Sequence, residues 1–165
     1  MKLLAEKRSS NDKYDVLRFV RNNGSATDTL MPRQGILPHD LIHYVVESAL
    51  PLRHGFLSQV ALGADAQFVL QAVHCAANPA VHRQAAQVEA IVEGLQTQLW
   101  CGSFDLGAFL EAANGACAAR GHPPFDLAGI DVHACLYQRA QALHAQWQEI
   151  PFHRALALDF SPRLG

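Results

Sequence analysis

Apolar and polar positions alternate in two short runs near the start of the chain, residues 2–8 and 14–21. In an extended chain successive side chains point to opposite faces, so this alternation is typical of strands with one buried face. The polar residues 9–12 between the two runs are typical of a turn. The pattern therefore predicts a two-stranded hairpin, which ends at the polar residues 22–25.

A loop with Pro32, Gly35 and Pro38 leads from the hairpin into an alanine-rich region with helical spacing of its apolar positions. Pro51 ends the first helix there, because proline cannot donate a backbone N–H and clashes with the preceding turn. Pro79 suits the first turn of a later helix. The predicted helices span residues 38–50, 53–74, 79–100, 105–120 and 130–149.

The C-terminal residues 154–160 alternate again, with Leu156, Leu158 and Phe160 on one side. A lone hairpin is marginally stable in water, so we expect this segment to pair with it as a third strand. The predicted fold is mainly α (α+β): a helical bundle of about five helices with a small antiparallel sheet from the N-terminal hairpin and the C-terminal strand. One domain is expected to span residues 1–165.

Composition narrows the class of protein. Half of the 165 residues are apolar and 17% are charged, which favours a folded globule over a disordered chain. The net charge of −2 provides no basic surface for nucleic acid. No apolar run approaches the ~20 residues of a membrane span. Without a signal-peptide pattern, and with four widely spaced cysteines, the sequence predicts a cytoplasmic protein with reduced thiols.

One run concentrates the reactive side chains: His39-Asp40-x-x-His43-x-x-x-Glu47. At about 100° per residue, His39, His43 and Glu47 fall within about 80° of one another on the predicted helix 38–50. Apolar residues fill the other side, so this polar face belongs to a helix that is largely buried. Two imidazoles one turn apart, followed by a carboxylate, can converge on one ion. The run predicts a metal site with His39, His43 and Glu47 as ligands.

Asp40 lies beside these ligands at the start of the helix, just after Pro38. The positive end of the helix dipole disfavours protonation of a nearby histidine, which leaves a neutral imidazole for a metal. The donor set suits a divalent ion, zinc first, with iron or manganese as alternatives. In a catalytic site Asp40 would act as a base or orient a histidine, and the ion would activate water or polarise a carbonyl of a small-molecule substrate.

A purely structural interpretation of the run is also open. His39 could pack at the helix start, Asp40 could complement the dipole and Glu47 could face solvent. Further residues could join a site. His54 could fold back toward the ion, although a cap or a surface position is more usual. Glu89 and Glu93, one turn apart on the predicted helix 79–100, could supply a facing carboxylate, although such pairs more often lie on a solvated face.

The His39-Asp40-x-x-His43 motif resembles several metal-dependent families to different degrees. H-E-x-x-H zinc proteases have glutamate where Asp40 stands, and HD-type phosphohydrolases need a histidine upstream of His39, where this chain has none. A closer match is the ubiquinone-biosynthesis family with H-D-x-x-H on a helix and a more distant glutamate. That resemblance implies a bound zinc ion, a helical fold and a link to quinone-ring chemistry. The distant glutamate would fall at Gly55, so the similarity is confined to the motif.

The longer stretch from Met31 to Gly63 resembles a family of small bacterial proteins of unassigned function. Its shared features are Pro38-His39-Asp40-Leu41-x-His43-Tyr44-x-x-Glu47 and the following Arg53-His54-Gly55-Phe56. This resemblance implies kinship and no activity.

Two functions remain open from the sequence. The first is a metal-binding protein or metal-dependent enzyme that acts on a small molecule through the His39-to-Glu47 helix. The second is a non-catalytic helical module that forms a homodimer or docks on a partner. The alanine-rich helices motivate the second, because several of their faces are apolar enough to pack on another chain.

Overall fold

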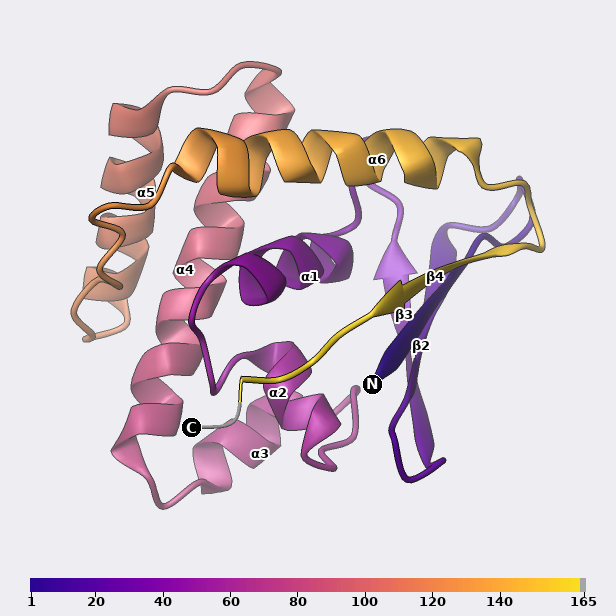
Figure 1. Ribbon diagram of the computed structural model, residues 1–165, viewed down its shortest axis with the longest axis horizontal. Coiled ribbons are helices and arrows are strands. Elements are labelled where there is room, and N and C mark those ends of the chain that lie inside the picture. The colour runs from indigo at the N-terminus through magenta and orange to yellow at the C-terminus, as the bar shows by residue number, and fades with distance from the viewer. Residues whose placement is uncertain (164–165) are drawn as a thin grey trace.

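The computed structural model describes residues 1–163, and its first feature is an antiparallel sheet of four strands. The strands are β1 (Lys2–Glu6), β2 (Tyr14–Val20), β3 (Ala26–Pro32) and β4 (Ala155–Asp159), in the order β3-β2-β1-β4. The N-terminal hairpin and the C-terminal strand beside β1 confirm the predicted α+β class (Figure 1).

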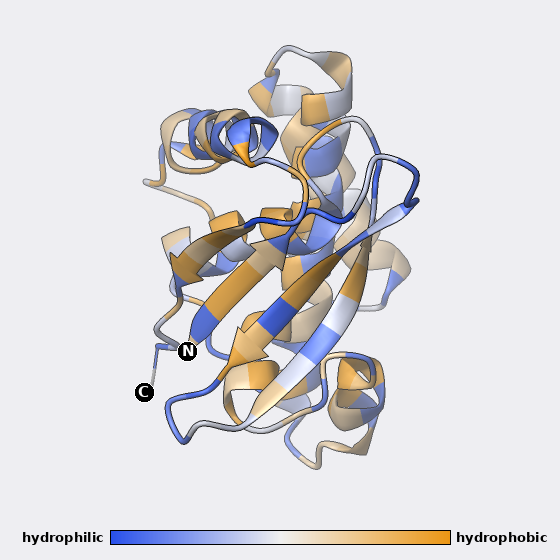
Figure 2. Ribbon diagram, turned by 90° about the vertical axis from the view of Figure 1, so that its right-hand side faces the viewer, coloured by the Kyte–Doolittle hydropathy of each residue, from blue (hydrophilic) through white to orange (hydrophobic). Residues whose placement is uncertain are grey.

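The sheet buries one face against the helices. Leu3 of β1 lies between Phe19 of β2 and Leu158 of β4, and Ala5 pairs with Leu17 one step along. Leu3, Ala5, Leu17 and Phe19 are all fully buried. The alternation of apolar and polar residues along these strands is visible in Figure 2. The period of two in the sequence thus sets which side of the sheet meets the rest of the molecule.

Strand β3 corrects the sequence prediction of a loop over residues 26–32. It pairs with β2 along its whole length, from Val20 opposite Ala26 to Tyr14 opposite Pro32. As an edge strand it buries only Met31, so its apolar positions give no stripe that the sequence could reveal. Pro32 fits because it is the last residue of an edge strand, where a missing N–H costs little.

The helices largely follow the predicted ranges. They are α1 (His39–Ala49), α4 (Pro79–Cys101), α5 (Leu106–Ala119) and a final helix that starts with a π-helical turn, η1 (His133–Gln138), and continues as α6 (Arg139–Glu149). Asn78 and Asp105 cap α4 and α5 by accepting hydrogen bonds from backbone N–H groups of the first turn.

The predicted helix 53–74 is wrong in one respect: it is two short helices, α2 (Phe56–Ala61) and α3 (Val69–Cys75). Gly63 breaks it with φ of 114°, a conformation that favours glycine. Arg21 of the segment after β2 holds the break in place, because its guanidinium donates to Val60 O at 2.6 Å and to Ala64 O at 2.7 Å.

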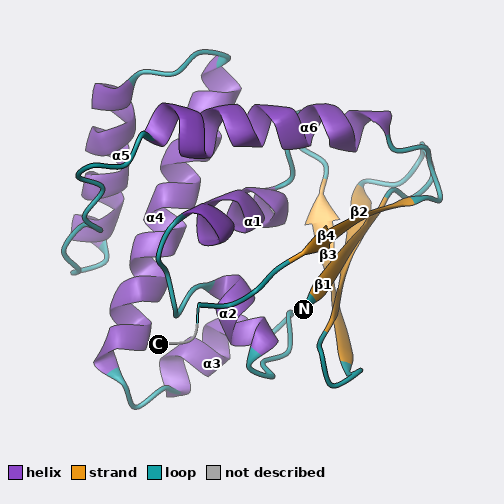
Figure 3. Cartoon of the chain, viewed as in Figure 1, coloured by secondary structure: helices purple, strands orange, loops and turns teal. Residues whose placement is uncertain are grey.

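Helix α1 lies at the centre of the fold. In Figures 1 and 3 it runs between the sheet and α4, with α6 on one side and α2 on the other. Leu41, Ile42, Val45 and Val46 of α1 are buried in the core that joins sheet and helices. No helix within residues 1–163 is long and apolar enough to cross a membrane. Because α1 is packed on several sides, the positions of the side chains that point from it toward α4 are well defined.

Candidate metal centre

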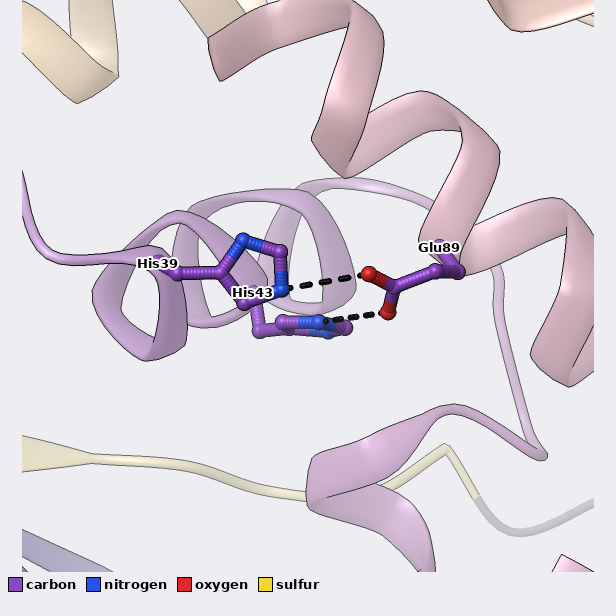
Figure 4. A group of neighbouring side chains, drawn as sticks. All are labelled: His39, His43 and Glu89. Atoms are coloured by element: carbon purple, nitrogen blue, oxygen red, sulfur yellow. Dashed lines mark hydrogen bonds and ion pairs between the residues drawn. The ribbon is translucent and has the colours of Figure 1, made fainter. Parts of the chain in front are cut away.

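Three side chains from two helices converge beside α1. His39 Nε2 lies 3.2 Å from Glu89 Oε1, and His43 Nε2 lies 3.1 Å from Glu89 Oε2. Figure 4 shows both imidazoles of α1 directed at the one carboxylate of α4. One ligand atom from each residue lies within 4.8 Å of the others. His39, His43 and Glu89 therefore form a group that could hold a metal ion.

The second nitrogen of each imidazole is held by a different acceptor. His39 Nδ1 lies 2.9 Å from Gln96 Oε1, and His43 Nδ1 lies 3.2 Å from Glu47 Oε1. Because these oxygens accept, each Nδ1 is the donor, and this fixes the orientation of both rings. Metal-binding histidines in proteins are held in this way through the nitrogen that does not face the ion.

Glu47 lies on the far side of His43 from Glu89. Its side chain is fully buried, and its carboxylate also accepts from Leu57 N at 3.1 Å and from Ser58 N at 3.3 Å. Those N–H groups belong to the first turn of α2, so Glu47 supplies the negative charge that a helix N-terminus favours. A Cβ at Gly55 would overlap the Glu47 carboxylate, so only glycine lets α2 approach this closely.

The charges of the cluster stabilise one another. Burial alone would lower the pKa of His43, but hydrogen bonds and charge from Glu47 and Glu89 outweigh it and raise that pKa to about 10. The hydrogen bond that His39 donates to Glu89 likewise raises the pKa of His39. Burial opposes ionisation of Glu89, yet the two imidazoles hold its pKa well below the usual range. Without an ion, His43 and Glu89 thus form an imidazolium–carboxylate pair, and His39 beside them is shifted toward its protonated form.

Asp40 lies on the same cavity wall as the two histidines. Burial raises its pKa, while the charges of His43 and His39 act in the opposite direction. Among residues 1–163 no side chain or backbone group forms a hydrogen bond with its carboxylate. Burial thus makes ionisation of Asp40 less favourable than that of a free carboxyl group.

The cluster opens on a cavity of about 660 Å³. This volume is in the range of small-molecule sites. Side chains from α1, α2, α3 and α4 line it, together with Arg120 and His122 after α5. The Phe56 ring packs 5.4 Å from the His43 ring and closes one side. The candidate ligands are therefore accessible from a space large enough for an organic molecule.

The structure places the residues named from the sequence in three ways. His39 and His43 meet as the helical spacing predicts, and Glu89 joins them as the facing carboxylate. Glu47 contacts His43 without joining the group of converging ligand atoms. His54 instead packs near α4, where its backbone N–H donates to Gln84 Oε1.

The role of Glu89 could be suggested from the sequence but not established. In the sequence Glu89 and Glu93 cannot be told apart, because each follows a valine and precedes a small residue. In the structure Glu93 pairs with Arg120 at 2.6 Å, whereas Glu89 faces the two histidines. Only the packing of α4 on α1 distinguishes the two. No protein-family model, curated protein or solved structure matches the chain.

Proposed function

We propose that this protein binds a divalent metal ion at His39, His43 and Glu89 and is a metal-dependent enzyme that acts on a small molecule in the adjacent cavity. The observation that carries the proposal is that both imidazoles direct the same nitrogen, Nε2, toward Glu89. Each is held through Nδ1 and presents Nε2 to the same carboxylate on the cavity wall. The two Nε2 atoms reach the two oxygens of this one carboxylate, so an ion between the three side chains would find a donor atom from each of them.

The spacing of the donor atoms fits an ion. Ligand atoms about 2.0 Å from a tetrahedral zinc ion lie about 3.3 Å from one another. The two nitrogen–oxygen distances here, 3.2 Å to Oε1 and 3.1 Å to Oε2 of Glu89, are close to that separation, and one donor atom from each of the three residues lies within 4.8 Å of the others. Binding would replace the protons between nitrogen and oxygen and would need only small movements of side chains that are already oriented.

Each residue of the site then has a role. His39, His43 and Glu89 bind the ion, while Gln96 and Glu47 orient the two histidines. Three protein ligands are the set found in catalytic zinc sites, where the ion lowers the pKa of a water or polarises a carbonyl. Asp40, with its raised pKa, takes or returns the proton.

The identity of the ion follows from donor chemistry. Two histidines and one carboxylate suit zinc, and the same set also holds iron in non-haem sites. We propose zinc first, with iron or manganese as the alternatives, and competition between these ions during loading distinguishes them. The alternative that the chain is a homodimeric or partner-docking helical module stays a prediction.

The test is metal analysis of protein that is purified without a histidine tag and then dialysed against zinc. The wild type is expected to retain one equivalent, and the double variant His39→Ala/His43→Ala none. The matched control is His133→Ala/His153→Ala, which removes two exposed histidines elsewhere and is expected to retain the ion. Stoichiometric zinc in the first double variant would contradict the proposal.

A further inference from the structure

The cavity extends from the ion-binding group along one face of α4. Ala85 and Ala86 line it between Glu89 and His82. Glu89 lies seven positions after His82, which corresponds to about 10 Å of helix with both side chains on one face. The small alanine side chains leave room along this stretch. This stretch of α4, with Glu89 at one end, His82 at the other and two alanines between them, is called the trough below, and the alanines are its floor.

Helix α3 forms the opposite wall with Val69, Leu70 and Val73. Leu70 is 71% exposed although it lines the cavity, so its side chain is available to a bound molecule. Phe56 of α2 adds an aromatic ring near the histidines. An apolar wall that faces an alanine floor favours a hydrocarbon body, because such surfaces gain free energy when they leave water together.

A permanent cation lies near the ion-binding end. Arg120 lines the cavity, and its guanidinium donates to the Glu93 carboxylate at 2.6 and 3.2 Å. The hydrogen bonds that Arg120 donates to Glu93 raise the pKa of the guanidinium. Glu93 lies one helical turn from Glu89 on α4, so this pair places the guanidinium at the ion-binding end of the cavity. A guanidinium has five N–H donors, so the Glu93 carboxylate and Ala116 O, which accepts from Nη1 at 3.2 Å, do not use all of them.

We propose that the substrate is an organic anion with an extended apolar body, whose acidic head binds beside Arg120 at the ion-binding end and whose body lies between Ala85, Ala86 and α3. An extended chain of eight carbons is about 10 Å long and matches the trough. This assignment rests on the proposed function, because it names the class of molecule that the candidate metal centre would act on.

The first experiment compares octanoate with octanamide by isothermal titration calorimetry on metal-free protein. The two probes share the same apolar chain and differ in charge. Octanoate is expected to bind about tenfold more tightly, since a charge-assisted hydrogen bond is stronger than a neutral one. Equal affinity for the two probes, or no octanoate binding up to about 10 mM, overturns the proposal.

The second experiment separates recognition by Arg120 from its pairing with Glu93. Arg120→Gln is expected to lower octanoate affinity about tenfold and to leave octanamide affinity unchanged. Glu93→Gln removes the same ion pair but keeps the guanidinium, so octanoate affinity should stay the same or rise. An equal loss in both variants would show that Arg120 acts only through its pair with Glu93. Circular dichroism confirms the fold of each variant.

The third experiment tests the apolar wall. Leu70→Ser changes a side chain that is mostly exposed, so the fold is expected to persist. Octanoate and octanamide should both bind about threefold to tenfold more weakly, because the chain loses an apolar contact. Unchanged affinity for both probes would place the apolar body elsewhere and overturn that part of the assignment.

Because the titrations use metal-free protein, failure of this inference can be distinguished from failure of the proposed function. If zinc fails to bind but octanoate binding still depends on Arg120, the metal assignment fails and the anion site stands. If zinc binds but octanoate and octanamide behave alike, the metal assignment stands and the substrate class is wrong. Repeating the octanoate titration on His39→Ala/His43→Ala should leave the dependence on Arg120 intact.

Discussion

Two regions of this molecule place acidic side chains next to basic ones, and only one of the two has the ligands of a candidate metal centre. At the sheet, Asp15 accepts from Arg33 Nη2 at 2.7 Å, from Arg33 Nε at 3.1 Å and from Arg8 N at 2.9 Å. Between α1 and α4, Glu89 faces His39 and His43 at similar distances. Burial and charge pairing alone therefore do not separate a structural pair from a candidate metal centre.

Donor chemistry and access separate the two regions. A guanidinium has only donors and stays charged, so Arg33 can hold Asp15 in place but cannot bind a metal. An imidazole that loses its proton gains a lone pair and becomes a ligand. Glu89, His39 and His43 line the cavity, whereas Asp15 does not. The same kind of pairing thus occurs without metal-ligand chemistry in one region, and in the other among side chains that could hold an ion.

The largest expected effect is loss of the ion in Glu89→Gln. Removal of one ligand from a zinc site should lower zinc affinity on the order of 1,000-fold, because each ligand carries several kcal/mol of the binding free energy. The control is Glu93→Gln, one turn further along α4 and also ion-paired, which should leave zinc affinity unchanged. Calorimetry measures both. Equal losses would remove Glu89 from the ligand set.

Next in size is the stability effect of Asp15→Asn. This change leaves Arg33 without its buried anion, so the free energy of unfolding should fall by about 3 kcal/mol in urea titrations while zinc affinity stays constant. Asp28→Asn is the control, because the Arg18–Asp28 pair is about half exposed at 3.7 Å and should contribute less than about 1 kcal/mol. A lower zinc affinity in Asp15→Asn would show that the two regions do not act independently.

A smaller effect is expected from Glu47→Gln, which keeps the size of the side chain but places an amide NH₂ among donors. Loss of the orienting acceptor of a metal-binding histidine typically lowers metal affinity about 10- to 100-fold. Gly55→Ala should act in the same direction, because its Cβ displaces the Glu47 carboxylate. If Glu47→Gln instead removes the ion as completely as Glu89→Gln, Glu47 is itself a ligand.

The most gradual effect is the pH dependence of zinc binding, which is small over a fraction of a pH unit and accumulates over several units. In the metal-free protein the pKa of His43 is raised to about 10 and that of His39 is also raised, so an ion must displace protons at neutral pH. Zinc affinity should therefore rise with pH between 6 and 8.5, by about tenfold per unit for each proton displaced. His43→Ala should show a shallower slope in the same titration. A flat profile in the wild type would contradict histidine ligation.

Part of this site could be predicted from the sequence because it lies on one helix. The spacing of His39 and His43 and the apolar positions around them predict both the helix and its shared face. The spacing also predicts that Glu47 lies on the same face as the two histidines. Its contact with the backbone N–H groups of α2 depends on how the chain folds back after α1, which no local pattern reveals. Glu89 becomes a candidate ligand only through the packing of α4 against α1, which is a long-range property.

The fold shows the same division between local and long-range information. The hairpin, the C-terminal strand and most helix ends follow from alternation, proline and capping residues. The edge strand β3 was not predicted, because only one of its residues is buried and its strand character depends on pairing with β2. The break between α2 and α3 depends on Gly63 and on Arg21, which reaches it from the sheet. Such features arise from contacts between distant segments.

The most direct test of the central claim is a crystal of the protein soaked in zinc, with an anomalous difference map recorded at the zinc absorption edge. The account predicts one strong peak about 2.0–2.2 Å from Nε2 of His39, Nε2 of His43 and an oxygen of Glu89. A peak at other residues, or a map in which the two imidazoles keep their direct contacts with Glu89 and no zinc lies between them, would contradict it.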